Sequence, residues 1–197
     1  MIRSEAKTWL SVPAISINRR VALPVAVAVF ALLTSVGGQI AVPLGVTPVP
    51  MTLQTLFVLL AGALLGPVAG ASSQLLYLAL GVAGVPVFAM GGAGFPWIFG
   101  PTGGYLMAFP MAAALTGWMA GREGHVLRTI AGFVAGTVVI FALGAAWLSV
   151  VTDLGPAALF AAAVQPFLVG AVTKVAIGVV GARLVLSRLV RKREAKA

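Results

Sequence analysis

Between Arg20 and Arg122 the sequence contains no aspartate, glutamate, lysine or arginine. This interval of roughly 100 residues has room for four membrane spans, because about 20 apolar residues cross the ~30 Å hydrocarbon layer of a bilayer. The whole chain is 60% hydrophobic and 9% charged, whereas soluble domains average about 45–50% and about 25%. These values exclude a soluble domain and a disordered chain. The sequence therefore predicts an integral membrane protein.

Turn-forming residues divide the apolar sequence into six predicted spans. The first five cover residues 21–42, 52–65, 67–83, 104–120 and 126–151. The last apolar block, 157–187, is too long for one untilted helix. We expect Pro166 to begin its main helix, since proline suits the first helical position, and 157–165 to form a short or re-entrant element. The expected organisation is an N-terminal segment 1–20, a membrane domain 21–187 and a basic tail 188–197. A secretory signal peptide at 21–36 is disfavoured because the apolar run continues beyond it.

The basic residues predict the orientation of these spans. With six spans, both termini and the loop between the fourth and fifth spans lie on one side. Every lysine and arginine except Lys174 falls on that side, which is therefore cytoplasmic by the positive-inside rule. We predict an all-α integral membrane protein with six transmembrane helices and both termini cytoplasmic, in a bacterial-type inner membrane. The net charge of +9 does not indicate nucleic-acid binding, because the basic residues lie at the ends and in one loop.

Lys174 is the exception, since it lies inside the last predicted span, about two turns or roughly 12 Å after Pro166. Burying an ammonium group at that depth costs about 2.5–3.5 kcal/mol. One interpretation is a lysine that extends its side chain toward the outer interface. The interpretation that we favour is a role in ligand binding or in an ion pair.

Motifs for catalysis are missing from the sequence. It contains neither a GxxxxGK[ST] phosphate-binding loop nor an HExxH zinc motif. No acidic residue lies deep in a predicted span; the four are Glu5, Glu123, Asp153 and Glu194. The single histidine, His125, lies in a predicted loop. We therefore expect neither an enzyme nor a metal or other cofactor. With zero cysteines, thiolate metal sites and disulfides are excluded.

Polar and aromatic residues gather at the predicted outer side. Gln39 ends the first span, and Thr52, Gln54 and Thr55 open the second. The Gly/Pro-rich segment 84–104 has no predicted secondary structure, and a segment of this length is typical of a lid or binding loop. It contains Phe88, Met90, Phe95, Trp97, Phe99 and Thr102, and Tyr105 follows it directly. An interfacial aromatic belt is one interpretation; a site for a small molecule with an apolar ring and a carboxylate is the other.

Small residues recur at helical spacing. The pairs Gly62/Gly66, Gly66/Gly70, Gly117/Gly121 and Gly132/Gly136 predict close helix packing within the chain. On the first span, Ala22/Ala26 and Ala31/Ser35 form a similar face. This face either packs internally or contacts another membrane subunit.

Four strings in this order resemble the BioY family. They are VTPVPMTLQT at 46–55, LLAGALLGP at 59–67, GVPVFA at 84–89 and FGPTGGYL at 99–106. The resemblance extends over about residues 21–187. BioY proteins are the biotin-binding S components of energy-coupling factor (ECF) transporters. The resemblance implies a six-helix S component that captures biotin at the outer face. It also implies a transmembrane coupling subunit and two ATPase subunits as partners, although some family members function without that module.

The resemblance also suggests which residues hold biotin. It places Lys174 against the valerate carboxylate, and Gln54 with backbone groups on the ureido function. The expected binding set is Gln54, Phe88, Met90, Gly91, Trp97, Phe99, Thr102, Gly103, Tyr105 and Lys174. The expected contacts with the coupling subunit are Ala22, Ala26, Ala31 and Ser35. The sequence departs from the family's PF(I/L)PGDLxK pattern at position 171, where Ala171 replaces the aspartate. The alternatives are an S component for a different vitamin and a membrane protein with a structural or assembly role.

Overall fold

The structure is a computed structural model that describes residues 19–121 and 125–194. The predicted N-terminal segment falls outside the described residues, apart from its last two positions, and so do 195–197 of the predicted tail. In order, the elements are α1 (Arg19–Gln39), β1 (Ala41–Val42), β2 (Met51–Thr52), α2 (Gln54–Leu65), α3 (Pro67–Val82), η1 (Ala89–Gly91), α4 (Phe95–Phe99), α5 (Gly103–Ala120), α6 (Val126–Val151), α7 (Pro156–Ala163), η2 (Gln165–Phe167) and α8 (Leu168–Glu194).

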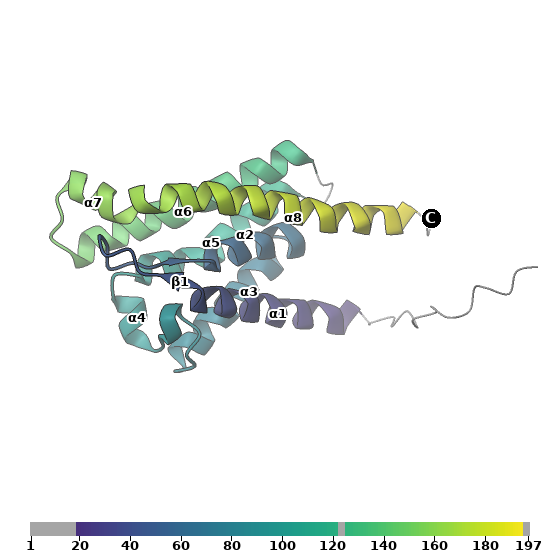
Figure 1. Ribbon diagram of the computed structural model, residues 1–197. Coiled ribbons are helices and arrows are strands. Elements are labelled where there is room, and N and C mark those ends of the chain that lie inside the picture. The colour runs from purple at the N-terminus through teal and green to yellow at the C-terminus, as the bar shows by residue number, and fades with distance from the viewer. Residues whose placement is uncertain (1–18, 122–124, 195–197) are drawn as a thin grey trace, which may run out of the picture.

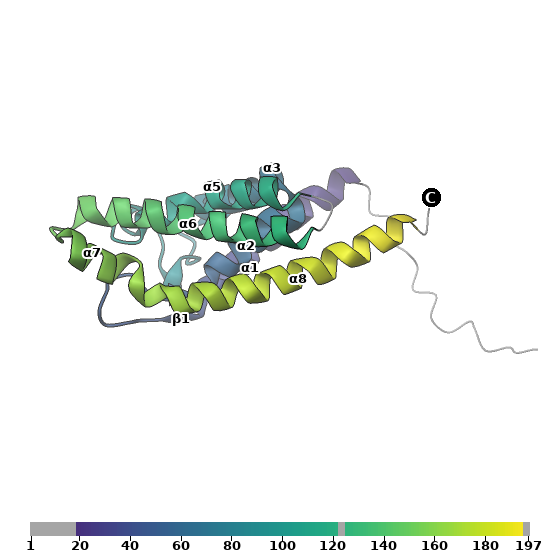
Figure 2. The same cartoon turned by 90° about the horizontal axis from the view of Figure 1, so that it is seen from above.

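The long helices run along one common direction (Figures 1 and 2). The start of α1, the end of α8 and the α5–α6 connection lie at one end of the bundle. The β1–β2 hairpin, α4 and α7 lie at the other end. The first end is the one that the basic residues predict to be cytoplasmic, so the second is the predicted outer end.

The distribution of polar and apolar side chains in the bundle is that of a membrane protein. Large apolar side chains cover its surface; Leu127 and Val169 are both 80% exposed. The polar side chains Thr34, Gln54, Ser73, Gln74, Thr116 and Thr129 are buried. A soluble protein would not leave so much apolar surface in contact with water. Helices at 21–39, 126–151 and 156–188 are long and apolar enough to cross a membrane, and α2 and α3 are shorter apolar helices. The all-α membrane class is confirmed, while six crossings remain a prediction.

The first helix ends at Gln39, three residues before the predicted end at 42. Gly37 and Gly38 weaken the last turn, and Pro43 prevents its continuation. The backbone becomes extended instead: Ala41 pairs with Thr52 and Val42 with Met51 in an antiparallel hairpin. This pairing holds the hairpin over the outer end of the bundle.

The segment 84–104 is more ordered than the sequence predicts. It contains the 3₁₀ turn η1 and the short helix α4. Phe88 is fully buried, and a Cβ on Gly81 would overlap its ring. In α4, Pro96 occupies the first turn and the rings of Phe95 and Phe99 stack, with centroids 6.1 Å apart. The buried ring of Phe88 and the short helix α4 therefore order a segment whose glycines predict a structureless loop.

The predicted close packing of small residues is present at most of the glycine positions. An added Cβ on Gly62 would lie 2.1 Å from the Ala113 carbonyl oxygen, and one on Gly117 would lie 2.6 Å from the Gly62 oxygen. Helices α2 and α5 therefore touch through their backbones. Gly66 and Gly121 have a different role, since both end helices at positive φ, 87° and 64°.

The last apolar block divides as predicted, with a small shift. The predicted short element is α7, and the 3₁₀ turn η2 holds Pro166. Helix α8 begins two residues after that proline, at Leu168. This geometry places Lys174 in the second turn of α8.

Candidate functional site

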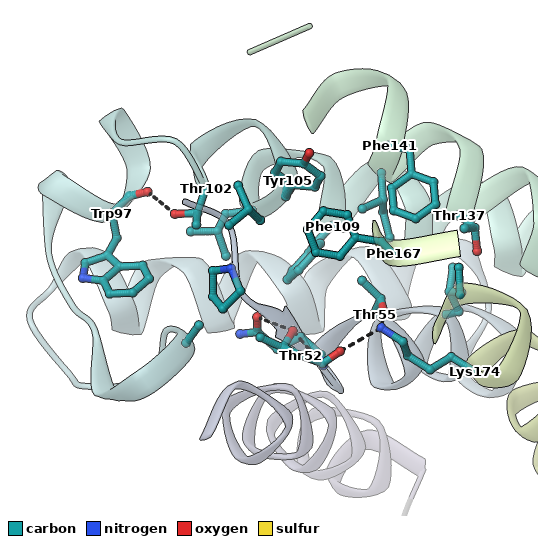
Figure 3. A pocket seen from close by; sticks show the side chains of 18 residues that line it. Thr52, Thr55, Trp97, Thr102, Tyr105, Phe109, Thr137, Phe141, Phe167 and Lys174 are labelled. Carbon is teal, nitrogen blue, oxygen red and sulfur yellow. Dashed lines mark hydrogen bonds between the residues drawn. The ribbon is translucent and has the colours of Figure 1, made fainter. Parts of the chain in front are cut away.

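A cavity lies between α2, α5, α6 and α8, near the outer end of the bundle. Its empty space is about 740 Å³, including the part that is open to solvent. The lining residues are Val49, Pro50, Thr52, Gln54, Thr55, Leu59, Ala89, Trp97, Thr102, Tyr105, Leu106, Phe109, Thr137, Ile140, Phe141, Phe167, Ala171 and Lys174. Figure 3 shows Lys174 at one end of the cavity and Trp97 at the other, with aromatic rings along one wall.

The cation of the cavity is Lys174. Its side chain is 9% exposed. Its Nζ donates to the carbonyl oxygen of Thr52 at 2.8 Å and to Oγ1 of Thr55 at 3.0 Å (Figure 3). Both acceptors are neutral, and an ammonium group has a third N–H. Among the residues whose side chains are described, the one carboxylate is that of Asp153, which does not line the cavity. The positive charge is therefore available to an anionic ligand.

Gln54 supplies a neutral polar group on the same side of the cavity. The Thr52 hydroxyl donates to Gln54 Oε1 at 3.1 Å, and Gln54 Nε2 donates to the Tyr77 hydroxyl. Tyr77 is fully buried on α3, so it fixes the amide from behind. One amide N–H and one lone pair of Oε1 remain. The amide can therefore pair with a ligand group that both donates and accepts.

The opposite wall is aromatic and held in place by hydrogen bonds. The Tyr105 hydroxyl donates to the carbonyl oxygen of Ala163 at 2.8 Å. The Thr102 hydroxyl donates to the carbonyl oxygen of Trp97 at 3.0 Å (Figure 3). The ring centroid of Phe167 lies 6.3 Å from those of both Tyr105 and Phe141. Such a wall favours an apolar ring, because burying its surface gains about 25 cal/mol per Å².

The structure brings half of the predicted binding residues into the cavity. Gln54, Trp97, Thr102, Tyr105 and Lys174 line it. They come from α2, α4, the start of α5 and α8, so segments far apart in the sequence meet here. Ala171, the position of the family aspartate, also lines the cavity, one turn before Lys174.

The other predicted binding residues lie outside the cavity lining. Phe88 is buried in the core, with its ring edge-on to Tyr77. Met90 is 61% exposed at φ 56°, and Gly91 follows it at φ 76°. Phe99 is exposed and stacks on Phe95. Gly103 is buried where an added Cβ would overlap the Ile98 carbonyl. These five residues therefore belong to the core or the surface of the bundle and not to the cavity lining.

Sequence reasoning missed much of the aromatic wall. Phe109, Thr137 and Phe141 line the cavity from mid-helix positions. A signal was present, since Phe109 follows Tyr105 by one turn and Phe141 follows Thr137 by one turn, which places each pair on one helix face. In an apolar helix, this spacing does not distinguish a cavity wall from ordinary core.

The predicted partner-contact face of α1 is largely internal. Ala31 is 1% exposed and Ser35 is 8% exposed. Next to them, the Thr34 hydroxyl donates to Oε1 of Gln74 on α3 at 3.2 Å. This face therefore packs against the bundle, which corrects the prediction that Ala31 and Ser35 face another subunit. Ala22 and Ala26, nearer the start of α1, are half-buried.

Comparison with known proteins relates this chain to one family of membrane proteins. A family model described as the BioY family matches residues 10–191. "Probable biotin transporter BioY" of Pyrococcus horikoshii is 43% identical over 154 residues, 78% of this chain and 90% of that protein. "Biotin transporter BioY" of Rhodobacter capsulatus is 37% identical over 159 residues, 75% and 83% of the two chains. The crystal structure of the S-component for biotin from an ECF-type ABC transporter matches with a TM-score of 0.69 at 25% identity, covering 92% of this chain and 95% of that one.

Proposed function

The chain belongs to the BioY family, and we propose that it is the biotin-binding S component of an ECF transporter. The observation that carries this function is the cavity, in which the buried ammonium group of Lys174 faces an aromatic wall and has no carboxylate partner among the described side chains. Biotin has a matching distribution of groups: a carboxylate, an aliphatic chain and a compact bicyclic ring with a ureido function.

The polar groups of the cavity suggest how biotin is oriented. The carboxylate accepts the third N–H of Lys174, near Thr55. The bicyclic ring lies along Tyr105 and Phe109 toward Trp97. The ureido group donates to the remaining lone pair of Gln54 Oε1 and accepts from its amide N–H. In this arrangement Ala171 contributes only space, so no carboxylate competes for Lys174 from the position one turn before it on α8.

Calorimetric titration of detergent-purified protein tests this function. We expect biotin to bind with nanomolar affinity, and riboflavin and thiamine not to bind. Tight binding of another vitamin in place of biotin would favour the alternative S component. Protein that is folded but binds none of the three would contradict a vitamin-binding role and favour a structural membrane protein.

We further propose that the chain crosses the membrane six times, with α7 at the outer side. The chain contains zero cysteines, so single cysteines can be placed without background. We expect Val46→Cys and Leu154→Cys in intact cells to react with a membrane-impermeant maleimide, because both lie in connections at the outer end. Leu127→Cys and Arg188→Cys should react only after permeabilisation. Labelling of Leu127→Cys and Leu154→Cys from the same side would contradict a crossing by α6.

The energy for uptake comes from partners in this proposal. Because the sequence has no phosphate-binding loop, ATP hydrolysis is assigned to ATPase subunits that act through a transmembrane coupling subunit. The chain itself captures biotin and catalyses no reaction, and its location is the bacterial-type inner membrane. Ala22 and Ala26 remain predicted contacts with the coupling subunit.

A further inference from the structure

A second hollow, which we call the α6–α8 groove, runs along the outside of the bundle. It has a volume of about 1140 Å³ counting its open side. Helices α6 and α8 lie side by side there (Figure 2). Its lining is apolar except for Thr137, and it includes Ile130, Val134 and Val138 of α6 and Val172, Ala176 and Val180 of α8. Most of these side chains are exposed, so the groove faces lipid rather than the core.

The groove has the length of one membrane leaflet. Its lining extends from Ile130 to Phe141 on α6 and from Leu168 to Val180 on α8, which is about 16–18 Å at 1.5 Å per residue. Half of the hydrocarbon layer is ~15 Å thick. The Ile130 end begins one turn after the start of α6, at the predicted cytoplasmic end. The other end, at Phe141, reaches the wall of the ligand cavity.

A cation lies in line with the groove at its cytoplasmic end. Arg183 follows Ala176 by seven residues, about two turns, so both lie on the same face of α8. Its side chain is exposed and forms no ion pair or hydrogen bond within the described part of the chain. Arg188 is also exposed, but it lies five residues further on, about 140° around the helix. Arg183 therefore extends the groove with a positive charge, and Arg188 does not.

We propose that the α6–α8 groove binds an acyl chain of an anionic phospholipid of the cytoplasmic leaflet, with the phosphate of that lipid at Arg183. The length, the apolar lining and the terminal cation match the parts of such a lipid in the right order. A transmembrane helix of another protein fits less well, because it would continue through the full ~30 Å of the bilayer, whereas the lining residues of the groove cover about 16–18 Å along α6 and α8. The inference depends on the membrane orientation proposed above and not on the identity of the vitamin.

Native mass spectrometry of the detergent-purified protein, with phosphatidylglycerol or phosphatidylcholine added, tests the site. We expect phosphatidylglycerol to be retained about fivefold more than phosphatidylcholine, the equivalent of ~1 kcal/mol for one basic residue near an anionic surface. Arg183→Gln should remove this preference. Ala176→Phe should fill the groove and lower the retention of both lipids. Arg188→Gln, the same change on another face of α8, should alter neither.

Equal retention of the two lipids by the unmodified protein would overturn the proposal, and so would an equal effect of Arg183→Gln and Arg188→Gln. Unchanged retention by Ala176→Phe, in protein with an unaltered melting temperature, would also overturn it and leave a protein helix as the occupant to test. Biotin titration of the same preparations separates these outcomes from failure of the proposed function, because Arg183 and Ala176 do not line the ligand cavity.

Discussion

Replacing Lys174 with methionine is expected to weaken biotin binding by at least tenfold, or about 1.4 kcal/mol. Methionine keeps most of the apolar stem but removes the ammonium. The carboxylate of biotin would then be buried without an opposite charge, and removing one partner of a buried ion pair costs about 3–5 kcal/mol. Calorimetric titration of the variant measures the loss. Arg188→Met, which removes an exposed cation from the same helix, should bind biotin normally.

A chemical change in the ligand completes this test. Biotinamide lacks the charged carboxylate, so it should bind the unmodified protein more weakly than biotin does. In Lys174→Met the two ligands should differ much less, because the interaction that distinguishes them is already absent. Such a cycle isolates the pairing of the two groups from other effects of the mutation. If both ligands bind the unmodified protein equally, the carboxylate does not contact Lys174.

The sequence predicts Lys174 because an ammonium group is chemically out of place in an apolar helix. A buried ammonium in a membrane span is costly unless it has partners. Gln54 is predicted differently, from its place among the polar residues at the outer end and from the family resemblance. Neither prediction identifies the partners, such as Tyr77 behind Gln54, because they come from another helix.

The aromatic part of the site could not be assigned in the same way. Phe88 and Trp97 lie in the same Gly/Pro-rich segment, yet one ring is buried against Gly81 and the other lines the cavity. The direction of each ring depends on local turns, including positive φ angles at Met90 and Gly91. Such turns leave no periodic pattern. Helices, by contrast, follow from the apolar runs, and α3, α5 and α6 match their predicted ranges within one residue.

The contact between α2 and α5 gives the prediction with the largest effect on stability. In Gly62→Ala the new methyl group would lie 2.1 Å from the Ala113 carbonyl oxygen, which is backbone and cannot rotate away. Relief requires α2 and α5 to separate, and overpacking of this kind costs about 3 kcal/mol. For a chain of this size, that corresponds to a decrease in melting temperature of roughly 6–12 °C. Thermal unfolding in detergent, followed by circular dichroism, measures it.

Gly181→Ala is the matched control, because that glycine also lies inside a helix but has no atom within 4 Å of the added methyl group. Alanine there should raise stability by about 0.5–1 kcal/mol. The two variants share one chemical change, so a difference between their melting temperatures reports the close approach of α2 and α5 and not helix propensity.

The separation of α2 and α5 in Gly62→Ala would also move Gln54 and Thr55 away from Tyr105 and Phe109 across the cavity. Gly62→Ala should therefore also bind biotin more weakly, although Gly62 does not line the cavity. If Gly62→Ala has the same melting temperature as the unmodified protein, α2 and α5 do not touch through their backbones.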